Sequence, residues 1–154
     1  MTGTRTFQTS ATLSAESLSL VQSDRTVSVP LGPQRITREY FRHSPPTPVE
    51  LEHAIQDIED SLHPAYRNIG GGNLHMRYAE LHGLQEFLRP AGTGARVLSR
   101  DELETAFSRL AALSEGRPSS QDPLPPDAHF AATLLIVREL MHHLDFSNLY
   151  LEKP

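Results

Sequence analysis

Near the middle of the chain runs Asn68-Ile69-Gly70-Gly71-Gly72-Asn73-Leu74, a glycine triplet between two apolar segments. The segment 65–69 predicts a strand before the triplet, and Met76, Ala79 and Leu81 predict a helix after it. Glycine lets the backbone turn sharply, and the start of a helix offers free N–H groups to a phosphate. The triplet is therefore either a phosphate-binding loop or a tight strand-to-helix connection, and its spacing alone leaves both interpretations open.

Composition limits the class of protein. The length of 154 residues suits one domain, expected over 1–154, with its own hydrophobic core. A formal net charge of −5 argues against a nucleic-acid-binding domain, and the lack of cysteine excludes disulfides and thiolate chemistry. No apolar run has the length of a membrane span, and the Ser- and Thr-rich start lacks a signal-peptide core. We therefore expect a soluble, cytoplasmic domain that binds neither nucleic acid nor membrane.

The first third of the chain has the pattern of half-buried strands. The segments 17–21 and 26–31 alternate polar with apolar residues, and the polar segment 22–25 between them has the length of a hairpin turn. A strand over 7–13 is one prediction for the start of the chain. Disorder or an atypical structure over 1–16 is the alternative.

Two helix starts carry a capping box, in which a hydroxyl side chain stands three residues before a glutamate. These starts are Thr47-Pro48-Val49-Glu50 and Ser99-Arg100-Asp101-Glu102. A third helix is expected after Asp127, followed by a closing strand over 146–151. The order of elements predicts an α/β fold, with a small mixed sheet, an antiparallel hairpin and helices packed against the sheet.

An arginine stripe marks the segment 34–43, which is expected to be helical. Arg35, Arg38 and Arg42 fall at helical spacing on one face of it. In one interpretation the stripe faces a polyanion, and in the other it is a solvated helix face.

Metal and catalytic chemistry have little support in the sequence. Glu139 and His142 lie three residues apart on an expected helix, a spacing that carboxylate-bridged metal sites use. Such sites also need matching ligands on other helices, so we predict structural histidines and no metal site. The sequence contains no Gly-x-Ser-x-Gly motif, and its paired carboxylates fall on solvated helix faces. We therefore predict no catalytic residue in this chain.

Several stretches match one protein family in order and spacing. They are Ser28-Val29-Pro30-Leu31-Gly32, Arg35-Ile36-Thr37, Pro45-Pro46-Thr47-Pro48, Ile69-Gly70-Gly71-Gly72-Asn73, Leu98-Ser99-Arg100-Asp101-Glu102-Leu103 and Arg109-Leu110-Ala111-Ala112-Leu113-Ser114. Together they resemble the exopolyphosphatase and guanosine pentaphosphate phosphohydrolase (Ppx/GppA) family, and specifically its second actin-like lobe. In that family a strand leads to a Gly-Gly-Thr or Gly-Gly-Asn loop, which corresponds here to the glycine triplet.

The resemblance implies a ribonuclease H-like (actin-like ATPase) half-fold and the hydrolysis of polyphosphate or guanosine pentaphosphate. It implies phosphate binding by four residues, Gly70, Gly71, Gly72 and Asn73. Arg35 and Arg38 are the expected polyanion contacts, and Mg²⁺ is the implied cofactor, with ligands outside this chain. The family's N-terminal lobe is missing from the sequence, so we expect no activity from this chain alone. That lobe, or a second copy of the chain, is the expected partner.

One departure from the family supports a second hypothesis. Leu13-Ser14-Ala15-Glu16-Ser17 stands where the resemblance places an Asp-x-Gly-Gly-Gly-Ser phosphate loop. The change adds Cβ atoms and a negative charge where a phosphate would approach. The alternative function is therefore a non-catalytic binding or interaction module that kept the actin-like fold. The intact glycine triplet favours the phosphohydrolase hypothesis, and the segment 14–17 favours the alternative.

Overall fold

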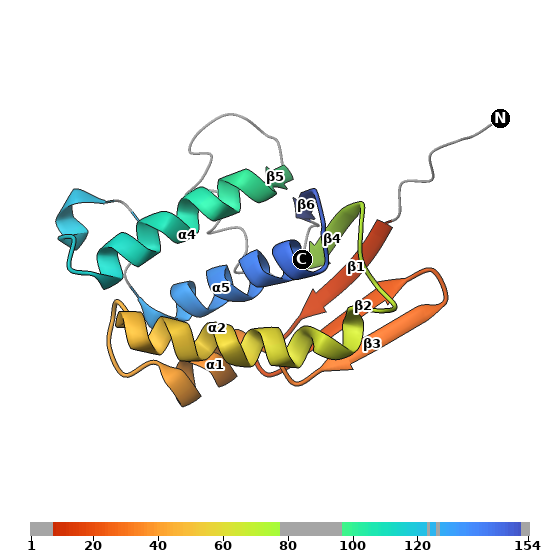
Figure 1. The fold of residues 1–154 in the computed structure, drawn as a ribbon, viewed down its shortest axis with the longest axis horizontal. Helices are drawn as coiled ribbons and strands as arrows, with labels where there is room; N and C mark the ends of the chain where they lie inside the picture. The colour runs from red at the N-terminus through yellow and green to blue at the C-terminus, as the bar shows by residue number, and fades with distance from the viewer. Residues whose placement is uncertain (1–7, 78–96, 123, 126, 152–154) are drawn as a thin grey trace.

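A mixed six-stranded sheet organises the fold (Figure 1). The computed structural model describes residues 8–77, 97–122, 124–125 and 127–151. The strands follow the order β3-β2-β1-β4-β6-β5 across the sheet. They are β1 (Gln8–Leu13), β2 (Leu18–Gln22), β3 (Arg25–Val29), β4 (Asn73–Arg77), β5 (Val97–Ser99) and β6 (Asn148–Leu151).

Strand direction divides the sheet into a parallel centre and antiparallel sides. β4 pairs in parallel with both β1 and β6, while β1, β2 and β3 form an antiparallel meander and β5 is antiparallel to β6. This arrangement confirms the predicted α/β fold with a mixed sheet and a hairpin. It also places the carboxyl ends of β1, β4 and β6 at one edge of the sheet.

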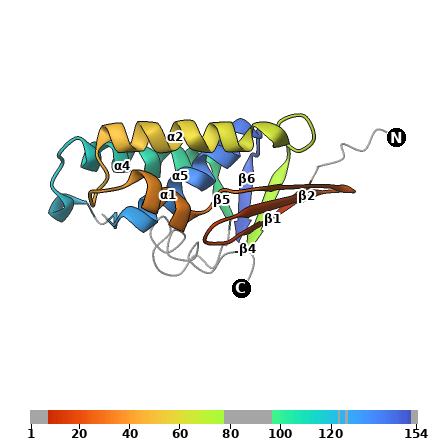
Figure 2. The same cartoon turned by 90° about the horizontal axis from the view of Figure 1, so that it is seen from below.

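The helices gather on one side of the strands (Figure 2). They are α1 (Pro33–Tyr40), α2 (Pro48–Leu62), α4 (Arg100–Ser114) and α5 (Ala128–His143), with the short 3-10 helices η1 (His63–Ala65) and η2 (Ser119–Gln121). α5 packs against α1, α2 and α4, and its residues 131–137 and 139–141 are all buried. No helix in the described part of the chain is long and apolar enough to cross a membrane.

Three local predictions were wrong. The segment 65–69 is not a strand, because the chain there leaves η1 and continues through turns. Met76 belongs to β4 and not to a helix, since the sheet on both sides of β4 imposes a period of two residues. Ala79 and Leu81 lie outside the described residues. Arg42 lies beyond α1, which ends at Tyr40.

Both predicted capping boxes are present. The Glu50 amide donates to Thr47 Oγ1 at 3.2 Å, and the Thr47 amide donates to Glu50 Oε1 at 2.9 Å. Ser99 and Glu102 make the same reciprocal pair at the start of α4. Asp127 caps α5 by accepting the Phe130 amide at 2.9 Å. These caps satisfy donors that the first turn of a helix leaves unpaired.

Replacing Thr47 by alanine is expected to lower the free energy of unfolding by about 1 kcal/mol. The change removes one acceptor at the start of α2 and leaves the Glu50 amide unpaired in the first turn. Urea unfolding followed by circular dichroism measures the difference. Thr105→Ala is the matched control, because Thr105 is an exposed residue inside α4. Equal losses in the two variants would contradict the role of the cap.

Candidate functional site

The glycine triplet lies at the amino end of β4. The element that follows Gly72 is this strand, so the triplet opens no helix and lacks the N–H groups on which the phosphate interpretation depended. The match to the family's loop also fails here, because that loop follows a strand while this one precedes it. Asn73 is the first residue of β4 and pairs with Gln8 and Asn148.

Backbone contacts hold the triplet against the carboxyl end of α5. The Gly71 amide donates to the Leu144 carbonyl at 2.9 Å, and the Ser147 amide donates to the Gly72 carbonyl at 2.8 Å. Gly70 has φ +155°, and a Cβ there would lie 2.7 Å from the Leu144 oxygen. The exposed carbonyls of a helix end carry partial negative charge, which repels phosphate. Phosphate binding by Gly70, Gly71, Gly72 and Asn73 therefore stays a prediction without structural support from a helix start.

A polar pocket of about 430 Å³ opens beside this loop. Its lining includes Gly70, Gly71 and two arginines, Arg25 and Arg67. Arg25 donates to the Asn68 carbonyl at 3.0 Å, so its guanidinium is held at the pocket. The two cations are the observation in this region that favours an anionic ligand.

The turn between β1 and β2 occupies the carboxyl edge of the parallel strands, where open α/β sheets bind ligands. Its Ala15 carbonyl accepts the Gln34 amide at 2.9 Å and the Arg35 amide at 3.4 Å, both from the first turn of α1. Gly32 lies so close that a Cβ there would sit 2.3 Å from the Ala15 oxygen. The backbone of the turn is thus closed onto the start of α1.

The arginines of α1 are paired with carboxylates. Arg38 donates to both oxygens of Glu16, at 2.6 and 3.0 Å, and this bond holds the pKa of Glu16 below its usual value. Arg35 lies 2.8 Å from an oxygen of Asp57 and 2.6 Å from one of Glu39. A polyanion would have to displace these carboxylates, so polyanion contact by Arg35 and Arg38 stays a prediction.

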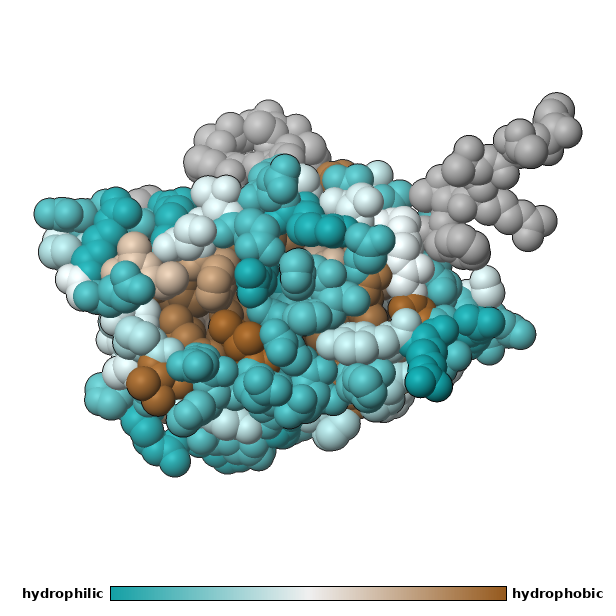
Figure 3. Space-filling view, viewed as in Figure 1, coloured by the Kyte–Doolittle hydropathy of each residue, from teal (hydrophilic) through white to brown (hydrophobic). Residues whose placement is uncertain are grey.

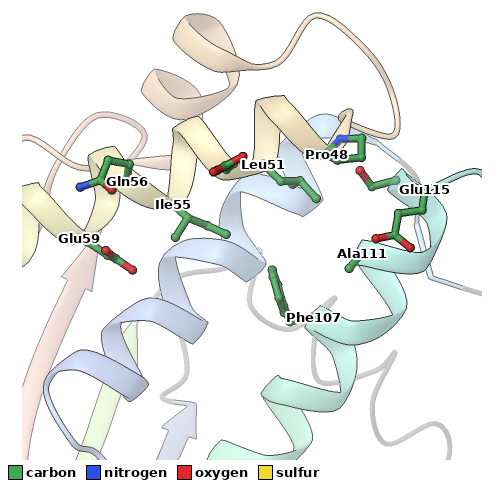
Figure 4. Close-up of a pocket in the computed structure, with 10 residues that line it drawn as sticks. Pro48, Leu51, Ile55, Gln56, Glu59, Phe107, Ala111 and Glu115 are labelled. Atoms are coloured by element: carbon green, nitrogen blue, oxygen red, sulfur yellow. The ribbon is translucent and has the colours of Figure 1, made fainter.

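An apolar groove separates α2 from α4. It has a volume of about 280 Å³, and Figure 3 shows brown hydrophobic side chains exposed over these helices. Figure 4 shows Leu51 and Ile55 facing Phe107 and Ala111 across the groove. Among the described residues, the polar lining of the groove includes no cation and three glutamates, which are Glu52, Glu59 and Glu115.

A cluster of metal-binding residue types forms between α2 and α5. The sequence singled out Glu139 and His142, but the structure pairs Glu139 with His143 and adds Glu59 from α2. Residues three and four apart lie on the same face of a helix, so sequence spacing does not distinguish His142 from His143. Glu59 was missed because only the tertiary packing of α2 on α5 brings it near.

Solved structures share the fold of this chain, whereas other comparisons give no match. No family model and no curated protein matches the chain. Among solved structures, an Aquifex aeolicus Ppx/GppA phosphatase matches with TM-score 0.75 and 14% identity over 96% of this chain and 53% of that one. An exopolyphosphatase-like protein gives 0.75 and 12% over 95% and 55%, and a Cytophaga hutchinsonii exopolyphosphatase gives 0.68 and 11% over 96% and 53%.

This chain has the actin-like fold of one half of a Ppx/GppA phosphatase. It spans about half the length of the solved structures that it matches. The match confirms the fold that the sequence resemblance implied. Identities of 12–14% establish a shared fold only.

Mg²⁺ is the cofactor that the Ppx/GppA resemblance implies. This ion takes an octahedral shell of oxygen ligands at about 2.1 Å. The acidic residue of the β1–β2 turn, Glu16, has both carboxylate oxygens bonded to Arg38. The β1–β2 turn therefore does not fit Mg²⁺, and an ion with ligands outside the chain stays a prediction.

Asp57→Asn is expected to lower the free energy of unfolding by about 2 kcal/mol at pH 7. Burial raises the pKa of Asp57, but hydrogen bonds from Arg35, Tyr40 and Ser61 outweigh it and hold the pKa below its usual value. The stabilisation is therefore complete above about pH 4 and is lost as the pH falls through the folded-state pKa. Urea unfolding at several pH values tests this. A difference between wild type and variant that stays constant down to about pH 2 would contradict it.

Proposed function

We propose that this chain is a Ppx/GppA-type lobe that acts by binding a protein segment and does not itself hydrolyse phosphate. The groove between α2 and α4 carries the proposal. Ile55, Phe107 and Ala111 are partly exposed and form a concave apolar surface there. Exposed apolar patches with a polar rim are typical of protein-binding sites.

The chemistry of the groove defines the partner. An amphipathic helix buries its apolar face in a groove of this kind, with anchor residues at helical spacing. The acidic lining adds a preference for charge, because Glu52 and Glu115 attract lysine or arginine beside those anchors. We therefore assign a helical segment with apolar anchors and basic flanks as the occupant.

The β1–β2 turn argues against hydrolysis by this chain. The resemblance places a phosphate loop at this turn, but the Ala15 carbonyl is bonded to α1 and Glu16 brings a carboxylate. Because Arg38 is paired with Glu16, the turn offers a polyanion no net positive charge. With Mg²⁺ and polyphosphate or guanosine pentaphosphate, phosphate release should equal the buffer rate, with an active Ppx/GppA enzyme as the positive control. Release above that rate by purified chain would contradict the proposal.

A peptide titration tests the groove. The probe is a 16-residue helical peptide with leucines at helical spacing and lysines beside them, and the control peptide has glutamates in place of the lysines. Ile55→Asp should weaken binding of the basic peptide at least about tenfold, while Val49→Asp should change it less than about threefold. Val49 is the matched control because it is 57% exposed on α2 and does not line the groove. Equal binding of the two peptides, or no binding, would overturn the proposal.

A phosphohydrolase lobe acting on polyphosphate or guanosine pentaphosphate is the second candidate function. The polar pocket with Arg25 and Arg67 beside the glycine loop favours it. If this pocket binds phosphate, Arg67→Gln should weaken polyphosphate binding at least about tenfold. An N-terminal lobe or a second copy as partner stays a prediction, as does the cytoplasmic location.

A further inference from the structure

The α2–α5 cluster consists of Glu59, Glu139 and His143. One potential ligand atom from each of the three residues lies within 4.8 Å of the others. His143 Nε2 is 2.8 Å from Glu139 Oε2 and 3.1 Å from Glu59 Oε1. Two ligands of a tetrahedral zinc ion at 2.0–2.2 Å lie about 3.4 Å apart, so side-chain rotations that bring the most distant pair of ligand atoms closer would complete a site.

Glu139 contributes a buried carboxylate to the cluster. Its side chain is fully buried in α5, and Arg138 engages its Oε1. Its Oε2 receives no well-directed hydrogen bond from the described residues, although it faces His143 Nε2. A buried carboxylate oxygen without such a bond is costly, and a cation would satisfy it.

Charge and access also suit a cation. The ion-pair network that includes the α2–α5 cluster contains three carboxylates, those of Glu59, Glu104 and Glu139, and one guanidinium, that of Arg138. With neutral His143 the sum is two negative charges, which a divalent ion balances. Glu59 extends from α2 toward α5 in Figure 4 and its side chain is 36% exposed, so an ion can enter from solvent.

The ring of His143 is held in a fixed orientation, as a metal ligand requires. Tyr66 stacks on it with the ring centroids 6.0 Å apart and an angle of 18° between the planes. Histidine nitrogen combined with carboxylate oxygen suits Zn²⁺ and related transition metals, whereas Mg²⁺ prefers oxygen ligands alone. We propose that Glu59, Glu139 and His143 bind a divalent transition-metal ion of the zinc class between α2 and α5, with water in the remaining position.

Calorimetric titration of the untagged chain with ZnCl₂ at about pH 7.5 tests the site, because its histidine must be neutral to bind. We expect one ion per chain. His143→Gln and Glu59→Gln should each weaken binding at least about tenfold, the size of effect seen even for residues around a metal site. The matched controls are His142→Gln and Asp60→Asn, since both residues are exposed neighbours on the same helices. They should change the affinity less than about twofold.

Cobalt gives a second readout that does not depend on heat. Co²⁺ bound by one nitrogen and two carboxylates in a four-coordinate site absorbs visible light, and His143→Gln should remove this absorption. Circular dichroism shows whether each variant folds. If His143→Gln does not fold, the Zn²⁺ affinity of Glu59→Gln alone tests the site. No Zn²⁺ binding up to about 1 mM, or equal losses in His142→Gln and His143→Gln, would overturn the proposal.

Discussion

Gly32→Ala is expected to lower the free energy of unfolding by about 3 kcal/mol or more. The Cβ would lie 2.3 Å from the Ala15 oxygen and 2.4 Å from its carbonyl carbon, and backbone atoms cannot move aside as a flexible side chain can. The Gly32 φ of −153° is extended, so the whole loss comes from the clash and none from the torsion angle. Relief of the clash requires the β1–β2 turn to separate from α1.

Urea unfolding measures this loss, and Gly71→Ala serves as the control. Gly71 has φ +80°, and a Cβ added there would meet no atom within 4 Å, so alanine adds only torsional cost, about 1 kcal/mol. A Gly32→Ala protein within about 1 kcal/mol of wild type would show that the turn is not closed as the structure has it.

Gly70→Ala is expected to lower the free energy of unfolding by about 2–4 kcal/mol, clearly more than Gly71→Ala. Alanine at Gly70 combines a positive φ of +155° with a contact of 2.7 Å to the Leu144 oxygen. The loss in free energy of unfolding should be the same with and without phosphate in the buffer, because the role of Gly70 is to let the loop pack against the end of α5. Equal effects of the two alanine substitutions would contradict this structural role.

Local signals were predictable from the sequence. The capping boxes at Thr47 and Ser99 involve residues three apart, so the chain itself brings the partners together. The hairpin of β2 and β3 followed from the alternation of polar and apolar residues. The order of these elements, with the resemblance to Ppx/GppA proteins, was enough to predict the fold.

Long-range packing limited the prediction of the site. The segment 73–77 is too short for periodicity to separate a strand from a helix, and its place between β1 and β6 decides the outcome. Arg38 and Glu16 pair across 22 residues, so sequence spacing alone could not show that an arginine of the stripe is bonded to a carboxylate. Glu59 and His143 meet across 84 residues, so their cluster is visible only in the folded chain.

Calorimetric titration of the wild-type chain with a short polyphosphate in the presence of Mg²⁺ tests the central claim most directly. We propose that this actin-like lobe, with its closed β1–β2 turn and structural glycine loop, does not act as a phosphohydrolase and binds no phosphate at the glycine loop. We predict no binding heat from wild type or from Gly71→Asp, whose added carboxylate would repel phosphate at the glycine loop. Binding by wild type that Gly71→Asp abolishes would contradict the claim and favour the phosphohydrolase lobe.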